Sequence, residues 1–213
     1  MIQLGNTELA LLPERAAYWP AQKTLLLADM HLGKDQVFRR SGMAVPAGVL
    51  AADLGRIDAL VDQTGAERLI VLGDWVHAPP RADDAWPEQI AQWRKAHAQL
   101  AVDLVLGNHD RSLDAWLAAW KISAHRPWLD LDGLRLVHDW TEAHNLPGVS
   151  GHLHPGALLK SRRQRLRLPA FLIGDDHLVL PAFGRFTGLM TETDFPAHRR
   201  YAIAGDQLVE LPN

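Results

Sequence analysis

The sequence predicts an α/β sandwich in which a central pair of mixed or parallel sheets is flanked by helices. Three observations predict this fold. In the first half, short apolar runs alternate with segments of helical spacing, which is typical of a parallel sheet covered by helices. The second half carries further short apolar runs separated by tight turns, which favours more β-structure. The 213 residues contain no repeat, low-complexity linker or shift in composition, so we expect one domain over residues 1–213.

Strands and helices are expected to alternate in the first half. The predicted buried strands are residues 24–28, 68–72 and 102–106, which read TLLLA, RLIVL and VDLVL. Between the first two, residues 47–61 place apolar side chains at helical steps and so predict a helix with one buried face. Residues 86–100 are the second predicted helix, with Pro87 in the first turn, where a missing backbone N–H is tolerated.

Short strands are expected to dominate the second half. They are predicted at residues 134–138, 170–173, 177–180, 201–204 and 207–211. Residues 174–176 (GDD) and 205–206 (GD) are predicted turns, because glycine and aspartate favour the backbone conformations that tight turns require.

Composition excludes several classes of protein. Hydrophobic residues make up 47% of the chain, enough for a sizeable core. Cysteine is absent, which excludes disulfides, zinc–thiolate sites, iron–sulfur clusters and thiol nucleophiles. A formal charge of −3 argues against binding nucleic acid by overall surface charge. No targeting segment or membrane-length apolar run is visible, so we expect a cytoplasmic protein without a membrane partner.

Metal-ligand residue types follow the predicted strands. Five clusters occur in order along the chain: Asp29 and His31; Asp74 and His77; Asn108, His109 and Asp110; His138 and Asp139; and His152 and His154. The carboxyl ends of strands in an open α/β sheet line the crevice where ligands bind. A single aspartate there more often caps a helix, and a single histidine is more often structural. Five such clusters in succession instead predict one shared site.

The ligand types indicate the metal chemistry. Gly73, Gly107 and Gly151 allow sharp turns and leave room beside the predicted site. Carboxylate, amide oxygen and imidazole suit Mn²⁺, iron or Zn²⁺. The ligands are too many for one tetrahedral ion. We therefore expect two divalent cations, Mn²⁺ first with iron or Zn²⁺ as alternatives, and Asp74 as the bridging carboxylate.

The ordered motifs resemble those of a known family. DxH at 29–31, GDxxH at 73–77, GNHD at 107–110, the single His138 and GHxH at 151–154 resemble the calcineurin-like metallophosphoesterases. The segments HLGK, FRRSG, GHLHP and LPAFG further resemble the bacterial DNA ligase-associated metallophosphoesterases, which are implicated in DNA repair. His77 departs from the broader family, in which aspartate or asparagine is common at that position.

The resemblance implies a role for each residue. Asp29, His31 and His154 would bind the first metal, and Asn108, His138 and His152 the second. Asp74 would bridge the two ions. His109 would bind no metal and would face the scissile phosphate, where it donates a proton to the leaving group; a purely orienting role toward Asp110 or Asp139 is the alternative. For His77, a contact with the site or substrate and a capping role are both open.

The expected activity is metal-dependent hydrolysis of a phosphodiester by a hydroxide between the two ions, with DNA as the substrate of a repair endonuclease. A small-molecule phosphodiesterase or phosphomonoesterase is the alternative enzyme, and a non-catalytic scaffold of the same fold is a further alternative. The resemblance implies DNA ligase or helicase partners. An apolar loop at Ala182 and Phe183 would support a homodimer if exposed.

Two further segments bear on the substrate. The basic tract of residues 160–167 (KSRRQRLR) follows the GHLHP cluster and could track a nucleic-acid backbone, or could be a solvated hairpin. Phe38 and the two arginines after it could lie at the entrance of the site. The tryptophans could stack on bases, although most of them, such as Trp93, Trp116 and Trp120, are expected in the core.

Overall fold

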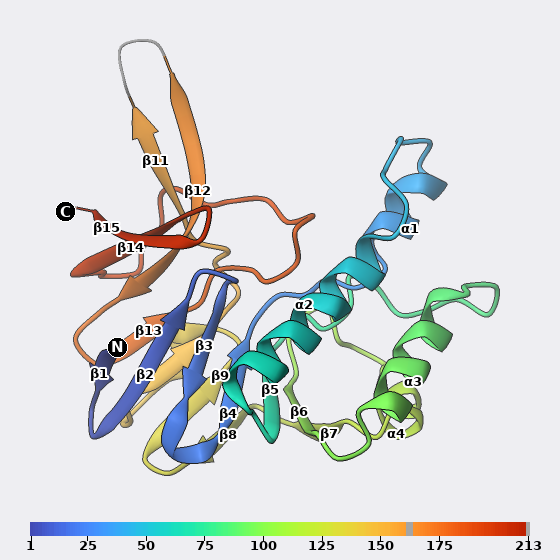
Figure 1. The fold of residues 1–213 in the computed structure, drawn as a ribbon, viewed down its shortest axis with the longest axis horizontal. Coiled ribbons are helices and arrows are strands. Elements are labelled where there is room, and N and C mark those ends of the chain that lie inside the picture. The colour runs from blue at the N-terminus through green and yellow to red at the C-terminus, as the bar shows by residue number, and fades with distance from the viewer. Residues whose placement is uncertain (161–163, 212–213) are drawn as a thin grey trace.

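Two mixed β-sheets stack face to face, and helices cover the outer face of the first sheet (Figure 1). The computed structural model describes residues 1–160 and 164–211. The first sheet has the order β1-β2-β3-β4-β5-β6-β7, comprising β1 (Ile2–Leu4), β2 (Thr7–Leu12), β3 (Ala16–Trp19), β4 (Thr24–Leu27), β5 (Arg68–Leu72), β6 (Ala101–Val105) and β7 (Ser123–His125). From β4 to β7 the strands are parallel, whereas β1 to β4 form an antiparallel meander.

The second sheet has the order β15-β14-β12-β13-β10-β9-β8, and β11 pairs with β12. Its strands are β8 (Trp128–Leu131), β9 (Leu134–Val137), β10 (Gly148–Ser150), β11 (Gly156–Lys160), β12 (Arg165–Ile173), β13 (His177–Val179), β14 (Arg199–Ala204) and β15 (Gln207–Leu211). Strand β10 runs parallel to both β9 and β13. The two sheets and their helices confirm the predicted α/β sandwich.

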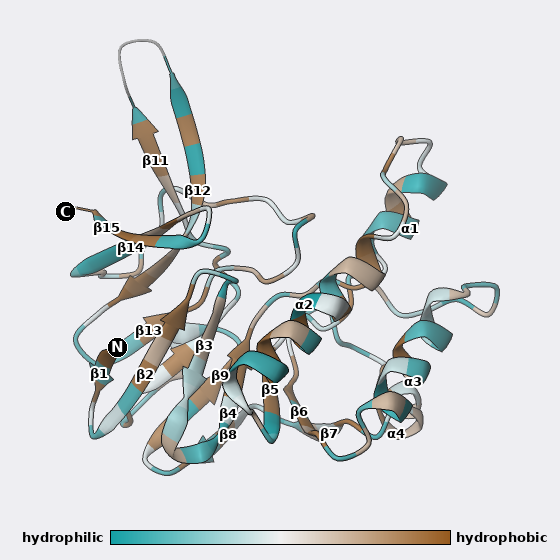
Figure 2. Ribbon diagram, in the orientation of Figure 1, coloured by the Kyte–Doolittle hydropathy of each residue, from teal (hydrophilic) through white to brown (hydrophobic). Residues whose placement is uncertain are grey.

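The helices are α1 (Lys34–Arg40), α2 (Val49–Thr64), α3 (Trp86–Ala96) and α4 (Asp114–Ala119), with short 3₁₀ turns at η1 (Pro20–Gln22) and η2 (Trp140–Glu142). Alternate residues of the first sheet face different layers. Leu25 and Leu27 pack with the helices, whereas Leu26 packs against the second sheet. Burial of both sheet faces explains why these strands are apolar throughout. Hydrophobic colour accordingly follows the strands in Figure 2.

Several boundaries differ from the sequence prediction. The helix predicted to reach residue 100 ends at Ala96. The Arg94 guanidinium donates to the carbonyls of His97 and Leu100, which holds the chain in a turn before β6 begins. The strand predicted at 170–173 begins at Arg165, as part of a hairpin with β11. The first three strands and α1 were not predicted.

The expectation that Ala182 and Phe183 form an exposed apolar loop was wrong. Both residues are buried. The Phe183 ring lies under the Arg56 guanidinium, 3.9 Å from the ring centroid, and its backbone N–H donates to the Ala28 carbonyl. This loop therefore gives no support to a homodimer. The tryptophans Trp93 and Trp120 are buried, as expected, whereas Trp116 is only partly buried against the same core.

No helix in the described part of the chain is long and apolar enough to span a membrane.

Candidate metal centre

The five predicted clusters meet where strands of both sheets end. Asp29 follows β4, Asp74 follows β5 and Asn108 follows β6, at the carboxyl edge of the parallel strands. From the second sheet, His138 follows β9 and His152 follows β10, which are also parallel to each other. The stacking of the two sheets brings these two edges together, so that side chains more than 100 residues apart in sequence share one site.

A deep group of ligand atoms comprises Asp29, His31, Asp74 and His154, whose ligand atoms lie within 4.8 Å of one another. His31 Nε2 is 3.1 Å from His154 Nε2 and 3.7 Å from Asp74 Oδ2. His154 Nε2 is 3.5 Å from Asp29 Oδ1. Asp29, His31 and Asp74 are all buried, so this group is largely shielded from solvent.

A shallow group comprises Asp74, Asn108, His138 and His152. His138 Nε2 is 3.0 Å from both Asn108 Oδ1 and His152 Nδ1, and 3.6 Å from Asp74 Oδ1. Asp74 therefore directs Oδ2 toward the deep group and Oδ1 toward the shallow group. This arrangement allows one carboxylate to be shared by two cations.

The backbone is strained at the ligand positions. Asp29, His31, Asp74, His152 and His154 all have a positive φ, between 45° and 68°. This left-handed region disfavours residues other than glycine, by an energy of order 1–3 kcal/mol each. Such strain is maintained only where the surrounding structure over-determines it, and it occurs preferentially at functional sites.

Three glycines leave the space that the polar side chains occupy. A Cβ atom on Gly73 would lie 2.0 Å from His138 Nδ1, and one on Gly107 would lie 2.3 Å from Asp74 Oδ1. On Gly151, a Cβ atom would lie 2.6 Å from Asp29 Oδ2. Any larger residue would displace a side chain of the site, so the sequence requires glycine at these positions.

The donor set fits a cation because carboxylate oxygens and imidazole nitrogens from several segments gather within 4.8 Å of one another. Asp29 Oδ2 accepts the His152 backbone N–H, but the buried Oδ1 has no hydrogen-bond partner among the described residues. An unpaired buried carboxylate oxygen is costly, and a divalent cation would compensate it. Burial, with nearby cationic groups, lowers the pKa of His31 to about 2, which keeps the imidazole neutral and its lone pair available.

A hydrogen bond from Nδ1, the ring nitrogen that faces away from the ligand group, orients His138. Its Nδ1 lies 3.0 Å from the Leu72 carbonyl, to which it donates. This bond places the lone pair on Nε2, the atom that faces Asp74 and Asn108. Histidines that ligate metals are commonly oriented in this way.

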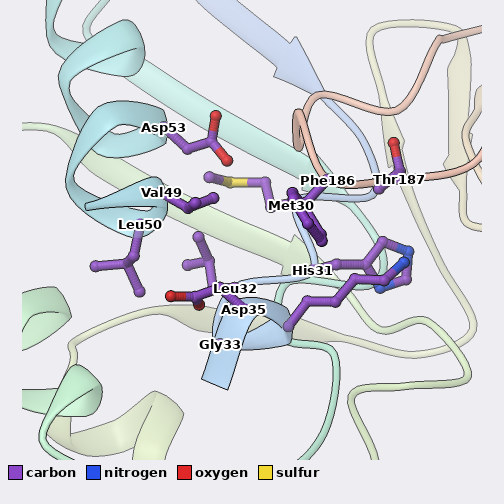
Figure 3. A pocket seen from close by; sticks show the side chains of 11 residues that line it. Met30, His31, Leu32, Gly33, Asp35, Val49, Leu50, Asp53, Phe186 and Thr187 are labelled. Atoms are coloured by element: carbon purple, nitrogen blue, oxygen red, sulfur yellow. The ribbon is translucent and has the colours of Figure 1, made fainter. Parts of the chain in front are cut away.

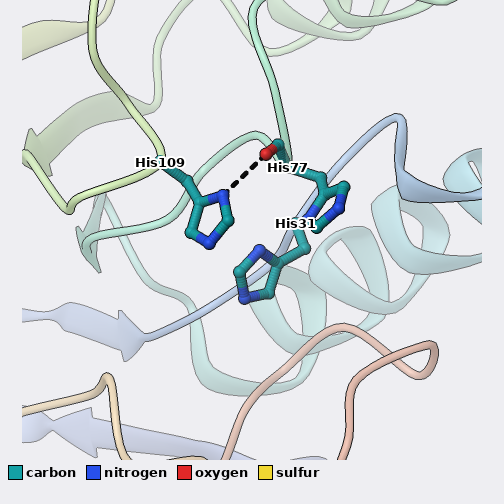
Figure 4. Close-up of side chains that lie close together, drawn as sticks. All are labelled: His31, His77 and His109. Carbon is teal, nitrogen blue, oxygen red and sulfur yellow. Dashed lines mark hydrogen bonds between the residues drawn. The ribbon is translucent and has the colours of Figure 1, made fainter. Parts of the chain in front are cut away.

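His109 lies beside the ligand groups together with His77 (Figure 4). Its backbone N–H donates to Asp74 Oδ1, and its Nδ1 donates to the His77 carbonyl at 2.7 Å. The other ring nitrogen, Nε2, lies 4.0 Å from Asp74 Oδ2. The His77 ring stacks on His109 with centroids 5.1 Å apart and lies edge-on to His31. His77 therefore reaches the site.

Asp110 joins the two loops that carry Asp74 and His109. Its carboxylate accepts the backbone N–H groups of Gly107 and Val76, at 2.9 and 3.2 Å. Burial raises the pKa of this carboxyl to about 6. Asp110 is thus a positioning residue, and the His109 side chain is oriented by the His77 carbonyl instead.

A small cavity of about 10 Å³ lies behind His31, between α2 and the segment that carries Phe186 and Thr187 (Figure 3). It has room for about one water molecule and cannot accept a substrate. Phe38 of α1 packs on Phe186 and approaches His77. Of the arginines that follow Phe38, Arg39 pairs with Asp35 and Arg40 with Asp84, and both guanidinium groups stay partly exposed.

Sequence reasoning assigned no role to Lys34, yet it lies at the edge of the site. Its ammonium is half-buried, and burial lowers its pKa, whereas the charge of Asp74 raises it. The HLGK motif that follows the first cluster was the available signal, because its lysine is three residues beyond His31.

Buried carboxylate and imidazole groups gather at the strand ends of two stacked mixed sheets, and together with full-length similarity to a solved nuclease they make the chain a metal-dependent phosphoesterase. Over 99% of its length, the chain is 37% identical to nuclease MPE of Pseudomonas putida, covering 98% of that chain with a TM-score of 0.83. This chain belongs to the metallophosphoesterase family.

Two more solved structures are remote. YfcE, a phosphoesterase from E. coli, is 17% identical, with 88% of this chain and 97% of that chain covered and a TM-score of 0.45. The protein AQ665 from Aquifex aeolicus, of unknown function, is 15% identical, with 66% and 81% covered and a TM-score of 0.44. No protein-family model matches the chain, and no curated protein matches it significantly.

Proposed function

We propose that this protein is a nuclease that hydrolyses phosphodiester bonds in DNA with two divalent cations, of which Mn²⁺ is the first choice. The observation that carries the proposal is Asp74, whose two carboxylate oxygens face two separate sets of ligand atoms. Similarity to nuclease MPE over the full chain supports a nucleic acid as the substrate.

Each ligand group would bind one ion. Asp29, His31 and His154 would hold the first, and Asn108, His138 and His152 the second, with Asp74 shared. When bound, the ions would activate a water molecule and neutralise the charge that develops on the phosphate oxygens. The protein supplies the frame for them, since the three glycines leave the space that ligand side chains occupy and five of the ligands have a left-handed backbone.

His109 would protonate the leaving oxygen. In its imidazolium form, the Nδ1–H group donates a hydrogen bond to the His77 carbonyl, and the Nε2–H group faces the region beside Asp74. The stack with His77 restricts rotation of the ring. Proton transfer of this kind contributes about 10²–10⁴-fold to the rate.

The proposal extends to the cellular role. Residues 1–213 would act as a single metallophosphoesterase domain. The resemblance to DNA ligase-associated enzymes supports a role in DNA repair, with a DNA ligase or helicase as the partner. Co-purification with a tagged ligase and a helicase from the same organism would test this part of the proposal.

The role of His109 is tested by His109→Ala, with His144→Ala as the control because His144 is an exposed histidine. Hydrolysis of bis(p-nitrophenyl) phosphate and cleavage of single-stranded DNA should both fall by about 10²–10⁴-fold in His109→Ala. Bound Mn²⁺, measured by elemental analysis, should stay at the wild-type level. Near-wild-type turnover would exclude proton donation by His109. A wild-type protein that hydrolyses the small diester but no DNA would instead favour a small-molecule substrate.

A further inference from the structure

The hairpin formed by β11 and β12 projects beyond the body of the molecule (Figure 1). Strand β11 begins at Gly156, two residues after His154 of the deep group. The register pairs Gly156 with Pro169 at the base and Lys160 with Arg165 near the tip. The hairpin is therefore an arm that starts at the candidate metal centre and leads away from it. Of the basic tract predicted at 160–167, residues 161–163 lie outside the described residues.

One face of the arm is basic and the other is apolar. Because opposed residues share a face and neighbours alternate, Lys160, Arg165 and Arg167 lie on one face. Leu159 and Leu166 lie on the other. The alternation appears as bands of hydrophilic and hydrophobic colour along β12 in Figure 2. At the base, the apolar face packs on the sheet, where Ala157 and Leu168 contact Ala202.

Among the described residues, the cations of the basic face have no acidic partner. Lys160, Arg165 and Arg167 are exposed, and none of them takes part in an ion pair among the described residues. Other arginines of the chain are neutralised, for example Arg68 by Asp103 and Arg135 by Asp130. Unpaired cations gathered on one surface repel one another, and a polyanion would relieve that repulsion. The arm thus carries a local positive field on a chain whose formal charge is −3.

The length of the arm fits a polymer rather than a small ester. Lys160 lies six residues beyond His154, which at about 3.4 Å per residue spans at most roughly 20 Å. A nucleic-acid strand of B-form geometry places one phosphate about every 3.4 Å along its axis, so this span corresponds to about six nucleotides. A small diester bound at the metal centre would not reach the basic residues.

The geometry points to the basic face of the β11–β12 arm as a second contact site for the nucleic-acid backbone, about six nucleotides from the scissile bond. This inference rests on the proposed nuclease function and adds the part of the substrate that lies beyond the reacting phosphate. Lys160, Arg165 and Arg167 bind phosphates without reading bases, so the contact raises affinity for long strands of any sequence.

The test compares two double charge reversals that change the net charge equally. R165E/R167E alters the arm, and K95E/K121E alters two exposed lysines on the helical side of the molecule. Each variant is assayed with Mn²⁺ on bis(p-nitrophenyl) phosphate, on a strand of four nucleotides and on a strand of thirty nucleotides.

R165E/R167E should lower kcat/KM on the long strand by about tenfold or more at low salt, and the slope of log(kcat/KM) against log[salt] should become shallower by about 1.4 for two lost phosphate contacts. Its activity on the two small substrates should stay within about twofold of wild type, and K95E/K121E should match wild type on every substrate.

Equal cleavage of the long strand by both variants would overturn the inference, as would a parallel loss on the small diester, which would show that the arm supports the metal centre. A change in molecular mass by light scattering in R165E/R167E alone would reassign the arm to self-association and also overturn it. If the wild type cleaves neither strand but hydrolyses the diester, the proposed nuclease function itself fails, and the arm contact fails with it.

Discussion

The two halves of the candidate metal centre differ in depth. Asp29 is 0% exposed and His31 is 5% exposed, so the deep group is largely shielded from solvent, although the His154 side chain is 19% exposed. In the shallow group, the His152 side chain is 38% exposed, and Asn108 is exposed as well. Asp74 is common to both. The site is thus built from a closed half and an open half that share one carboxylate.

The difference in exposure suits two separate requirements of a phosphoesterase, which must hold its ions firmly and must also admit the substrate. Electrostatic interactions are stronger where solvent is excluded, so the deep group should hold a cation more tightly. Substrate must approach from solvent, and the open side of the shallow group leaves room for that approach. We therefore expect the ion of the shallow group to be the weaker-bound of the two.

The largest effect is expected where one change disturbs both halves. In Gly107→Ala, the new Cβ atom would collide with Asp74 Oδ1 and with the Asp74 backbone nitrogen. Displacing the shared carboxylate by about 1 Å should lower turnover of bis(p-nitrophenyl) phosphate by at least about 100-fold. Elemental analysis should also find less total Mn²⁺ than in wild type, because the displaced carboxylate serves both halves.

The matched control is Gly55→Ala, in α2. A Cβ atom there meets nothing within 4 Å, and alanine should stabilise the helix by up to about 1 kcal/mol. Gly55→Ala should therefore retain full activity. If Gly107→Ala is as active as Gly55→Ala, Asp74 is not the shared ligand.

Removing one ligand from either half should have a smaller effect and should show which half binds its ion more tightly. His152→Ala removes a ligand of the open half alone and should reduce bound Mn²⁺ from about two equivalents to about one. His31→Ala opens the buried half and should weaken the tighter site. Titration by calorimetry would measure both variants. Loss of the tight site in His152→Ala would reverse the assignment of deep and shallow affinity.

Much of this site was predictable because topology limits where strand ends can lie. Residues such as Asp29 and Asp74 each follow a short apolar run, and parallel strands place their carboxyl ends at one edge. The meeting of those clusters therefore required only the assignment of the strands. The metal-binding role of each residue remains a prediction that the ion measurements test.

Other features were not predictable, for physical reasons. His77 lies in a loop, where the direction of a side chain depends on backbone angles that the residue type does not determine. The left-handed backbone at Asp29 and His152 is imposed by the surrounding fold against local preference. The basic residues and leucines that alternate in the β11–β12 arm would also fit a solvated loop. Only the strand register shows that the basic residues lie on one face and the leucines on the other.

The smallest expected effect is on the folding stability that His177 contributes close to the shallow group. His177 is buried in β13 and bonds through Nε2 to the Ser150 hydroxyl, two residues before His152. Burial lowers the pKa of His177 to about 4 from 6.5, although Asp139 raises it. Because the folded-state pKa is lower than the unfolded one, the stabilisation is present above pH 6.5 and is lost as the pH falls toward 4.

Over that range the contribution of His177 to the free energy of unfolding should fall by about 3 kcal/mol. Urea unfolding of wild type and of His177→Gln, at pH 7 and at pH 4.5, would measure it. The variant should lose less stability than wild type on acidification, and His144→Gln should behave as wild type. If His177→Gln and wild type lose the same free energy of unfolding between pH 7 and pH 4.5, another group is responsible for the loss of stability in acid.

The most direct test of the central claim is anomalous diffraction from crystals grown with Mn²⁺. Two peaks are expected beside Asp74, one among Asp29, His31 and His154 and the other among Asn108, His138 and His152. A single peak, or none within coordination distance of Asp74, would contradict the claim.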